Sequence, residues 1–283
     1  SPSTSSQTYR GPSAFSEPEI QAVKFFSEEH DFLMVLNYHT YGNLLIYPWG
    51  YAQSLYTPDS ALFVEYAKVM TEQNNYTYGT GDQTVGYIVN GDSDDWQYGE
   101  QTTKGKALSF TPEAGDNDDG FWPTSSRIIP ISKSNLRQNL NYAHLAGKYA
   151  RVEDRSPTTL SNITSYIDFE IKRLGLDSPA TFTVNLVPIS AQIASVGGSV
   201  IFSAMSLLET KIDSISVELN AGVNDGDQIK FLLNIDNGSF IVSDTITKTY
   251  GTGITVFTDN ANSIASWTSS GNWGLTTEDY HSA

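Results

Sequence analysis

Residues 32–51 read FLMVLNYHTYGNLLIYPWGY, and this stretch decides the fold. It contains two short apolar runs, 32–36 and 44–47, each with the length of a buried strand, and a Pro-Trp-Gly-Tyr turn follows the second. His39 lies between the runs, beside a threonine and a tyrosine. In α/β enzymes, titratable side chains beyond the end of a buried strand are where catalysis takes place. The stretch therefore predicts an α/β unit with His39 in its functional site.

Helices are predicted on both sides of this stretch. Ser16 and Glu19 have the spacing of a capping box, which predicts a helix that continues to about residue 30. Apolar periodicity predicts two further helices, over about 60–74 and 132–150, and a short strand at 107–111 lies between them. Helices that alternate with buried strands indicate an α/β fold class for this half of the chain.

Composition limits the classes of function. The chain has 283 residues, room for two domains and part of a third, and a net charge of −16, which argues against nucleic acid and anionic membranes as partners. It has no cysteine, so disulfides, cysteine-bound zinc and a thiol nucleophile are excluded and a metal would need His, Asp or Glu ligands. No run of 18 apolar residues exists to span a membrane. Its Asn, Ser, Thr, Gly and Tyr content fits a secreted or cell-surface bacterial protein.

The pattern changes after residue 155. Helical periodicity stops, and short alternating strands follow, separated by Asn/Asp/Gly turns such as 224–227 and 236–238. This spacing is typical of an all-β sandwich, and it resembles the immunoglobulin-like sandwiches appended to secreted bacterial proteases. We therefore expect three domains: an α/β unit at 1–154, a β-sandwich at 155–253, and the start of a jelly-roll-like unit at 254–283.

Three ordered segments carry a family resemblance. They are residues 9–19 together with the His39 segment, residues 87–98, and residues 108–113 followed by 120–123. Their order and spacing resemble the C-terminal half of the catalytic domain of the zinc metallocarboxypeptidases, the family of pancreatic carboxypeptidases A and B and their bacterial relatives. The resemblance covers about residues 5–150, and it implies a zinc cofactor and peptide or protein C-termini as substrates.

The resemblance implies a role for each matching residue. His39 matches the third zinc ligand, and Glu113 matches the general base and acid that acts on zinc-bound water. Tyr87 matches the mobile tyrosine that closes over the C-terminus of the substrate, and Tyr41 matches a tyrosine of the cleft, next to a cis peptide at Thr40–Tyr41. Taken singly, each of these residues is more simply a packing or surface residue. The three motifs in order favour the catalytic interpretation.

Asp94 has two interpretations. The residue just before the Asp-Trp pair lies at the floor of the specificity pocket in the resembling family, where an acid would favour C-terminal Lys or Arg through charge pairing. An exposed acid in an acidic loop is the equally simple alternative.

Part of the family's site has no match in this sequence. None of the four histidines is followed by Glu at the third position, and no Asn-Arg pair occurs, so the His-x-x-Glu zinc ligands and the substrate-binding arginines are missing. We therefore expect a fragment of a secreted zinc carboxypeptidase that is inactive alone. A half-domain should also leave apolar surface uncovered, so we expect it to dimerise or to pack against the missing N-terminal half. The alternative is a non-catalytic binding or adhesion module with a degenerate carboxypeptidase-like scaffold.

Overall fold

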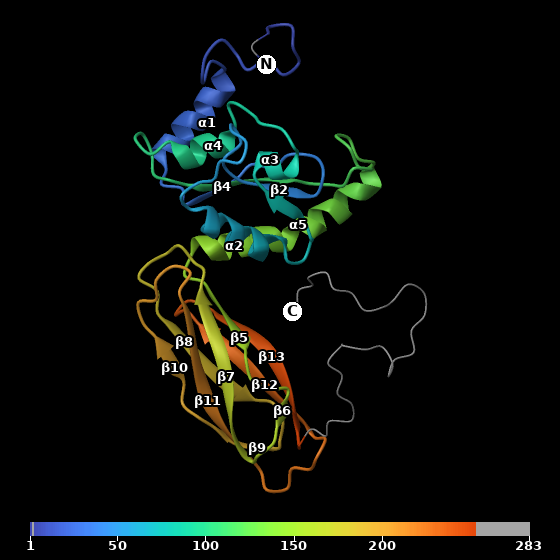
Figure 1. The fold of residues 1–283 in the computed structure, drawn as a ribbon, viewed down its shortest axis with the longest axis vertical. Helices are drawn as coiled ribbons and strands as arrows, with labels where there is room; N and C mark the ends of the chain where they lie inside the picture. Colours follow the sequence, from blue (N-terminus) through green and yellow to red (C-terminus); the bar gives the residue numbers. More distant parts are fainter. Residues whose placement is uncertain (2, 253–283) are drawn as a thin grey trace, which may run out of the picture.

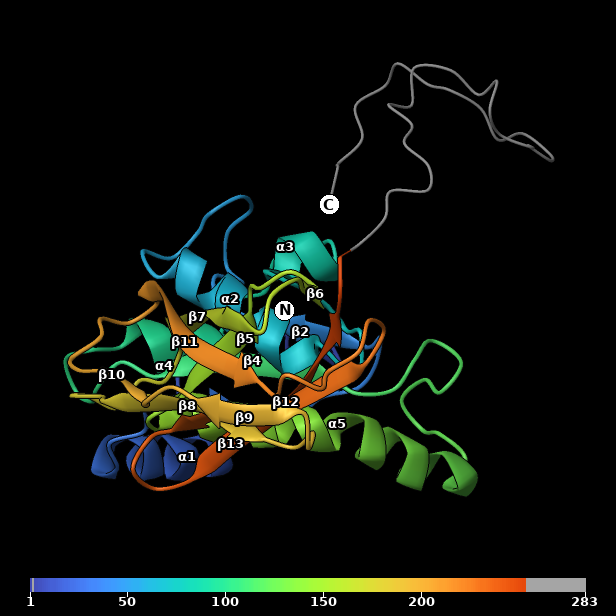
Figure 2. The same ribbon diagram turned by 90° about the horizontal axis from the view of Figure 1, so that it is seen from below.

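The chain folds into two units that lie end to end. The structure, a computed structural model, describes residues 1 and 3–252, so the unit expected at 254–283 lies outside the described residues. Figure 1 shows an α/β unit that carries the N-terminus, with a β-sandwich directly below it. Seen from below in Figure 2, helices α1 and α5 run along one side of the molecule, and α2 and α3 lie toward the other.

The α/β unit has a mixed four-stranded sheet with the order β1-β4-β2-β3. Strand β4 pairs parallel with β1 and antiparallel with β2, so β4 lies inside the sheet and β1 forms one edge. The elements are α1 (Pro18–Glu29), β1 (Met34–Leu36), β2 (Leu44–Ile46), α2 (Ser60–Thr71), β3 (Thr77–Gly79), α3 (Gly81–Thr84), α4 (Ser93–Gly99), β4 (Leu108–Glu113) and α5 (Ser125–Ala146). The mixed α/β fold expected from the sequence is therefore present.

An aromatic cluster forms the core between this sheet and α2. Phe63, Tyr66 and Phe110 are fully buried, and the Phe63 and Phe110 rings meet edge to face with their centroids 5.2 Å apart. Tyr47 stacks on Phe63 at 5.4 Å. Burial of such large rings is the main stabilising contribution available to so small a sheet.

Helix α1 differs from the sequence-based prediction in its cap and its contacts. Glu17 is the N-cap residue and makes no side-chain capping bond, because Ser16 Oγ donates to Glu17 Oε1 instead. The predicted capping box is therefore wrong. The apolar side chains of the helix lie in solvent, with Val23 and Phe26 each 54% exposed, and Ser27 is the buried residue of the helix.

Helix α5 begins at Ser125, seven residues before the predicted start. Arg127 in its first turn is bound by Asp119, with an Nε–Oδ1 distance of 2.6 Å, and by Asp116 at 3.1 Å. These ion pairs hold the first turn ahead of Pro130, which the sequence pattern alone suggests as a helix boundary.

The inner face of α5 is polar. Asn135 Nδ2 donates to Tyr76 Oη at 2.9 Å, and Gln138 Oε1 accepts from Asn74 Nδ2 at 2.8 Å. Further along, Asn141 Nδ2 donates to a backbone carbonyl of α2 at 2.6 Å. The three amides are nearly inaccessible, whereas four apolar side chains are on the outer side of the helix (Ile128, Ile129, Leu136 and Leu140, 45–60% exposed). In the last turn, Leu145 is fully buried in the core. Ahead of its last turn, the usual arrangement of an amphipathic helix is thus reversed.

The second unit is a sandwich of two sheets, in the orders β10-β8-β12-β13-β6 and β5-β7-β11-β9. Apolar side chains from both sheets form one core cluster, in which Ile167, Phe182 and Phe231 are fully buried. The first strand, β5, begins ahead of the boundary expected from the sequence, and an immunoglobulin-like topology stays a prediction. The strands are β5 (Ala150–Asp154), β6 (Thr159–Leu160), β7 (Thr164–Arg173), β8 (Phe182–Pro188), β9 (Ile193–Val196), β10 (Val200–Phe202), β11 (Thr210–Leu219), β12 (Gln228–Asp236) and β13 (Ile241–Tyr250).

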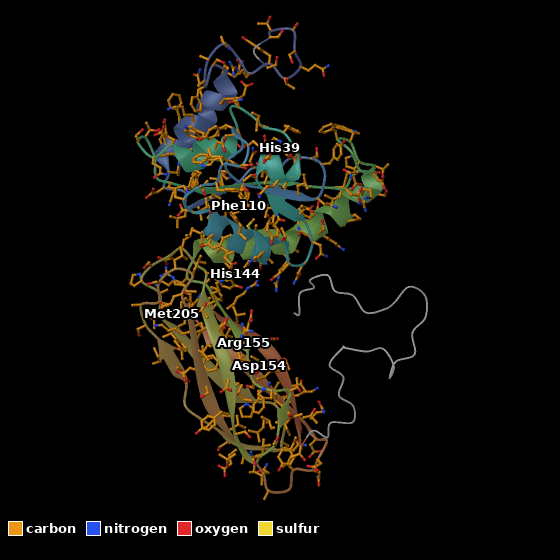
Figure 3. The ribbon with its side chains drawn as sticks, in the orientation of Figure 1. His39, Phe110, His144, Asp154, Arg155 and Met205 are labelled. Atoms are coloured by element: carbon orange, nitrogen blue, oxygen red, sulfur yellow. The ribbon has the colours of Figure 1, made fainter. Side chains whose placement is uncertain are left out.

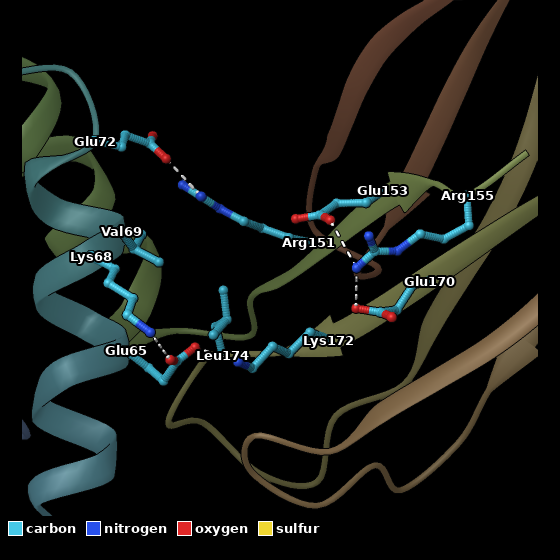
Figure 4. Close-up of a pocket in the computed structure, with 10 residues that line it drawn as sticks. All are labelled: Glu65, Lys68, Val69, Glu72, Arg151, Glu153, Arg155, Glu170, Lys172 and Leu174. Atoms are coloured by element: carbon cyan, nitrogen blue, oxygen red, sulfur yellow. Dashed lines mark hydrogen bonds and ion pairs between the residues drawn. The ribbon is translucent and has the colours of Figure 1, made fainter. Parts of the chain in front are cut away.

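The two units are joined by a packed seam. Tyr66 Oη of α2 donates to the carbonyl of Leu174 at 2.5 Å, and the Leu174 side chain belongs to the core cluster of the α/β unit. Beside this contact is a cavity of about 520 Å³ lined by alternating acids and bases, in which Arg151 pairs with Glu72 across the seam at 2.6 Å (Figure 4). The charged groups of the cavity form ion pairs with one another, and the pairs that cross the seam link the two units.

Candidate active site

The backbone of two strands brings His39 and Glu113 together. His39 follows β1 and pairs in parallel with Glu113 at the end of β4. The His39 N–H donates to the carbonyl of Pro112 at 2.9 Å, and the His39 carbonyl accepts from the N–H of Ala114 at 2.9 Å. Figure 3 places His39 in the α/β unit, away from His144 near the seam. The sheet register therefore fixes the imidazole and the carboxylate as neighbours.

One oxygen of the Glu113 carboxylate is left without a hydrogen bond within the described residues. Its Oε2 is buried without a hydrogen-bond partner in the part of the chain that the structure describes. Burial raises the pKa of Glu113, and the neighbouring His39 partly opposes that rise. A buried, unpaired carboxylate oxygen beside an imidazole fits the surroundings of a metal-bound water.

The ring of His39 is oriented by Asn37. The Asn37 side-chain nitrogen lies 3.1 Å from His39 Nε2 and 2.8 Å from Ser93 Oγ at the start of α4. Among the described residues, His39 Nδ1 has no hydrogen-bond partner and is the nitrogen left for a metal. Sequence reasoning missed Asn37. Its position two residues before His39, on the same side of an extended chain, is a signal that could have identified it.

Asp94 is buried between α4 and β4. Its side chain is inaccessible to solvent, and Oδ1 accepts from Ser109 Oγ at 2.5 Å, whereas Oδ2 is buried without a partner among the described residues. Burial and the nearby Asp92 carboxylate raise the pKa of Asp94 to about 8. The exposed-loop interpretation of Asp94 is therefore wrong.

The two tyrosines occupy different surroundings. Tyr41 follows a cis peptide bond after Thr40, as expected, and its ring meets Phe121 edge to face at 4.9 Å. Tyr87 is 61% exposed in the segment between α3 and α4, and its hydroxyl makes no hydrogen bond within the described residues. The structure thus joins His39 to Glu113 and leaves Tyr87 as a free side chain on a loop.

Within residues 1 and 3–252, no group of three or more His, Asp or Glu side chains could hold a metal ion. In the same residues, no helix is both long and apolar enough to cross a membrane. His39 is therefore a single candidate ligand among the described residues, and the carboxylates of Glu113 and Asp92 both lie close enough to interact with its ring.

The sequence of this half of the chain is similar to known proteins. The zinc carboxypeptidase profile matches residues 1–138. This segment is therefore similar to the zinc carboxypeptidase domain. It is 36% identical to carboxypeptidase A1 of Bos taurus over 141 residues, which are 47% of this chain and 32% of the relative. It is 34% identical to carboxypeptidase B of Canis lupus familiaris over 149 residues, 50% of this chain and 34% of the relative.

A solved structure also matches this half. Bovine thrombin-activatable fibrinolysis inhibitor, in complex with tick carboxypeptidase inhibitor, has 28% identity and a TM-score of 0.44, with 50% of each chain covered. The chain spans about a third of the length of the curated relatives it matches.

Proposed function

We propose that residues 1–147 form one part of the catalytic domain of a secreted, zinc-dependent metallocarboxypeptidase, which hydrolyses C-terminal residues from peptides. The observation that carries this proposal is the His39–Glu113 pair, held side by side by the backbone, with the Glu113 Oε2 buried and unpaired. Export from a bacterial cell is part of the same proposal, supported by the cysteine-free, Asn/Ser/Thr-rich composition.

Each residue of the pair has a defined task. When bound, zinc lowers the pKa of its water and polarises the scissile carbonyl. His39 is a neutral nitrogen ligand for the metal, and Asn37 sets the orientation of its ring. Glu113 accepts the proton of the attacking water and later donates it to the leaving amine. Its raised pKa lies closer to neutral pH than that of an ordinary carboxyl group, which suits a group that first takes up and then releases a proton.

Selectivity for the C-terminal side chain comes from Asp94. Its buried, half-satisfied carboxylate would pair with the cation of a C-terminal Lys or Arg, which would also lower the pKa of Asp94 and leave it charged. Tyr41 lines the cleft beside Glu113, and exposed Tyr87 is free to fold over the carboxyl end of the substrate.

The other zinc ligands must come from a further part of an α/β domain. The open edge of β1 offers a parallel position for another strand. The exposed apolar faces of α1 and α5, on the same side of the molecule in Figure 2, offer apolar area for its helices. We propose that the complementary part of a carboxypeptidase domain covers this side, and that the 283-residue chain alone binds zinc weakly and cleaves no peptide.

A chimera tests the catalytic proposal. Residues 1–147 would replace the matching segment of canine carboxypeptidase B, and zinc content and hydrolysis of peptides ending in Arg or Phe would be measured. We expect Glu113→Gln to retain zinc and to reduce kcat by about 10²–10⁴-fold, and His39→Ala to lose zinc. Ser126→Ala, at the exposed start of α5, is the matched control.

The outcomes separate the alternatives. Full activity of a zinc-loaded Glu113→Gln chimera would contradict the role of Glu113. A zinc-loaded, correctly folded chimera without any activity would favour the non-catalytic scaffold. Rapid hydrolysis by the purified 283-residue chain would contradict the proposed need for a complementary part.

A further inference from the structure

Lys248 is a lysine buried in a place where lysines rarely lie. It belongs to β13, and only 1% of its surface is accessible. Its neighbour on the paired strand is Ile229, which is fully buried, and Ile246 lies two residues before it on the same face. A charged ammonium group in apolar surroundings is costly unless it is paired or neutralised.

One carboxylate faces this amine. Lys248 Nζ lies 2.5 Å from Asp154 Oδ2 and also donates to the carbonyl of Ser156 at 3.1 Å. Asp154 closes β5, the first strand of the sandwich, whereas Lys248 belongs to the last strand, β13, in the opposite sheet. Figure 3 places Asp154 in the sandwich, well apart from His39. The pair therefore joins the two ends of the described sandwich.

The groups around the pair have the arrangement of an acyl-transfer site. The N–H of Ser156 donates to Asp154 Oδ1 at 3.0 Å, where negative charge would develop if the carboxyl carbon were attacked. The amine occupies the other oxygen, and the Ser156 carbonyl holds one of its hydrogens. Nucleophile and carbon are thus kept within contact distance by the fold, which replaces the entropy of a bimolecular encounter.

We propose that Lys248 and Asp154 are joined by an intramolecular amide bond in the folded protein. The ammonium of Lys248 gives one proton to Asp154 Oδ2, which leaves a neutral amine and a carboxylic acid. Nζ then forms a bond to the carboxyl carbon, the bond from that carbon to Oδ2 breaks, and a second amine proton leaves with this oxygen as water. No oxidant or other reactant is needed. Two buried charges are replaced by one neutral amide, which removes the cost of keeping them from water.

The leaving water has a way out, because the Asp154 side chain retains 21% of its accessible surface, whereas the Lys248 side chain retains 2%. The other ion pairs among residues 1 and 3–252 lack this combination of a buried amine and a partly exposed acid. The Lys172–Glu65 pair, for instance, has 32% and 25% exposure of its two side chains, so water solvates both charges. Burial of the amine, and not the mere presence of an ion pair, distinguishes the Lys248–Asp154 site.

Intact mass spectrometry of the purified 283-residue chain tests the bond. We expect a mass below the sequence mass by one water. After trypsin digestion, the peptide 152–155 should be attached to the peptide 231–283, with no cleavage after Lys248, because acylated lysine is not a trypsin site. Asp154→Asn should reach the same final mass by release of ammonia, since the same amide forms.

Matched variants separate the site from other dehydrations. Lys248→Met, which keeps the buried apolar stem, should have its full expected mass, and Lys172→Met should still lack one water. Full mass of the folded wild-type chain would overturn the proposal and leave a buried ion pair. A water loss that maps to Asp225–Gly226, where cyclisation to a succinimide also releases water, or to another position, without the branched peptide, would overturn it as well.

Discussion

Replacement of the buried acid Asp94 should remove most of the loss of stability that the α/β unit shows as pH rises from 5 to 8. Asp94 is inaccessible to solvent, and burial together with Asp92 raises its pKa from 3.8 to about 8. The folded state therefore binds this proton more tightly than the unfolded state. The resulting stabilisation is complete below pH 3.8 and is lost as pH rises through about 8.

The size of the effect follows from this rise in pKa. Each tenfold change in proton affinity corresponds to about 1.4 kcal/mol, so the ceiling is about 6 kcal/mol. Relaxation and water entry around the charged group reduce it, and we expect a loss of about 2–3 kcal/mol between pH 5 and 8 that is specific to Asp94. In Asp94→Asn this dependence disappears. The variant starts about 1–3 kcal/mol less stable at pH 5, because its amide nitrogen takes the unpartnered position of Oδ2, and the two curves converge near pH 8.

Urea unfolding at pH 5 to 9, followed by tryptophan fluorescence, measures both curves. Trp49, Trp96 and Trp122 lie in the α/β unit, and residues 150–252 contain no tryptophan, so in a variant with Trp267→Phe and Trp273→Phe the signal reports the unit that contains Asp94. Asp59→Asn is the control: burial raises the pKa of Asp59, but hydrogen bonds from Lys106 and Tyr98 hold it below its usual range, so this variant should not flatten the curve above pH 5. Parallel pH dependence of the wild type and Asp94→Asn would refute the reasoning.

Three further substitutions test the packing. Arg173→Met removes a buried guanidinium that donates to several carbonyls, so the sandwich should become about 3 kcal/mol or more less stable in urea melts followed by circular dichroism. As a control, Arg155→Met at an exposed ion pair should cost less than about 1 kcal/mol. Phe110→Ala should cost the α/β unit about 3–5 kcal/mol, seen as an earlier fluorescence transition, and an unchanged midpoint would contradict the packing described for this ring. Lys172→Met breaks the ion pair with Glu65 across the seam. Because water reaches both side chains, the change should weaken the coupling of the two units by less than about 1 kcal/mol at low salt, and the difference from the wild type should vanish in 1 M salt.

The pairing of His39 with Glu113 could be predicted because both residues occur in the three ordered segments that carry the family resemblance. His39 and Glu113 occur in segments whose order is informative, and the structure places them on adjacent strands. Strand β7 could also have been found, since Ile167, Phe169 and Ile171 alternate with polar residues and all three are fully buried.

Other features depend on contacts that no local pattern contains. The depth of Asp94 is set by α4 packing on β4, which closes the pocket around a residue that looks exposed in an acidic segment. The link from Asn37 to Ser93 joins residues 56 positions apart. Hydrophobic periodicity predicts that α5 has an apolar face, but it does not predict what covers that face. In a two-layer protein the apolar face would be expected to pack on the sheet, whereas most of the apolar face of α5 points away from it.

The reversed polarity of α5 has a consequence for tolerance to substitution. Amide hydrogen bonds are directional, so the contacts of Asn135, Gln138 and Asn141 fix the rotation of the helix about its own axis. Apolar contacts have no preferred direction, so the side that carries Leu136 and Leu140 can accept surfaces of different shape. Variation among functional variants should therefore be asymmetric around this helix: aliphatic residues exchange freely on its outer side, whereas its inner amides stay fixed.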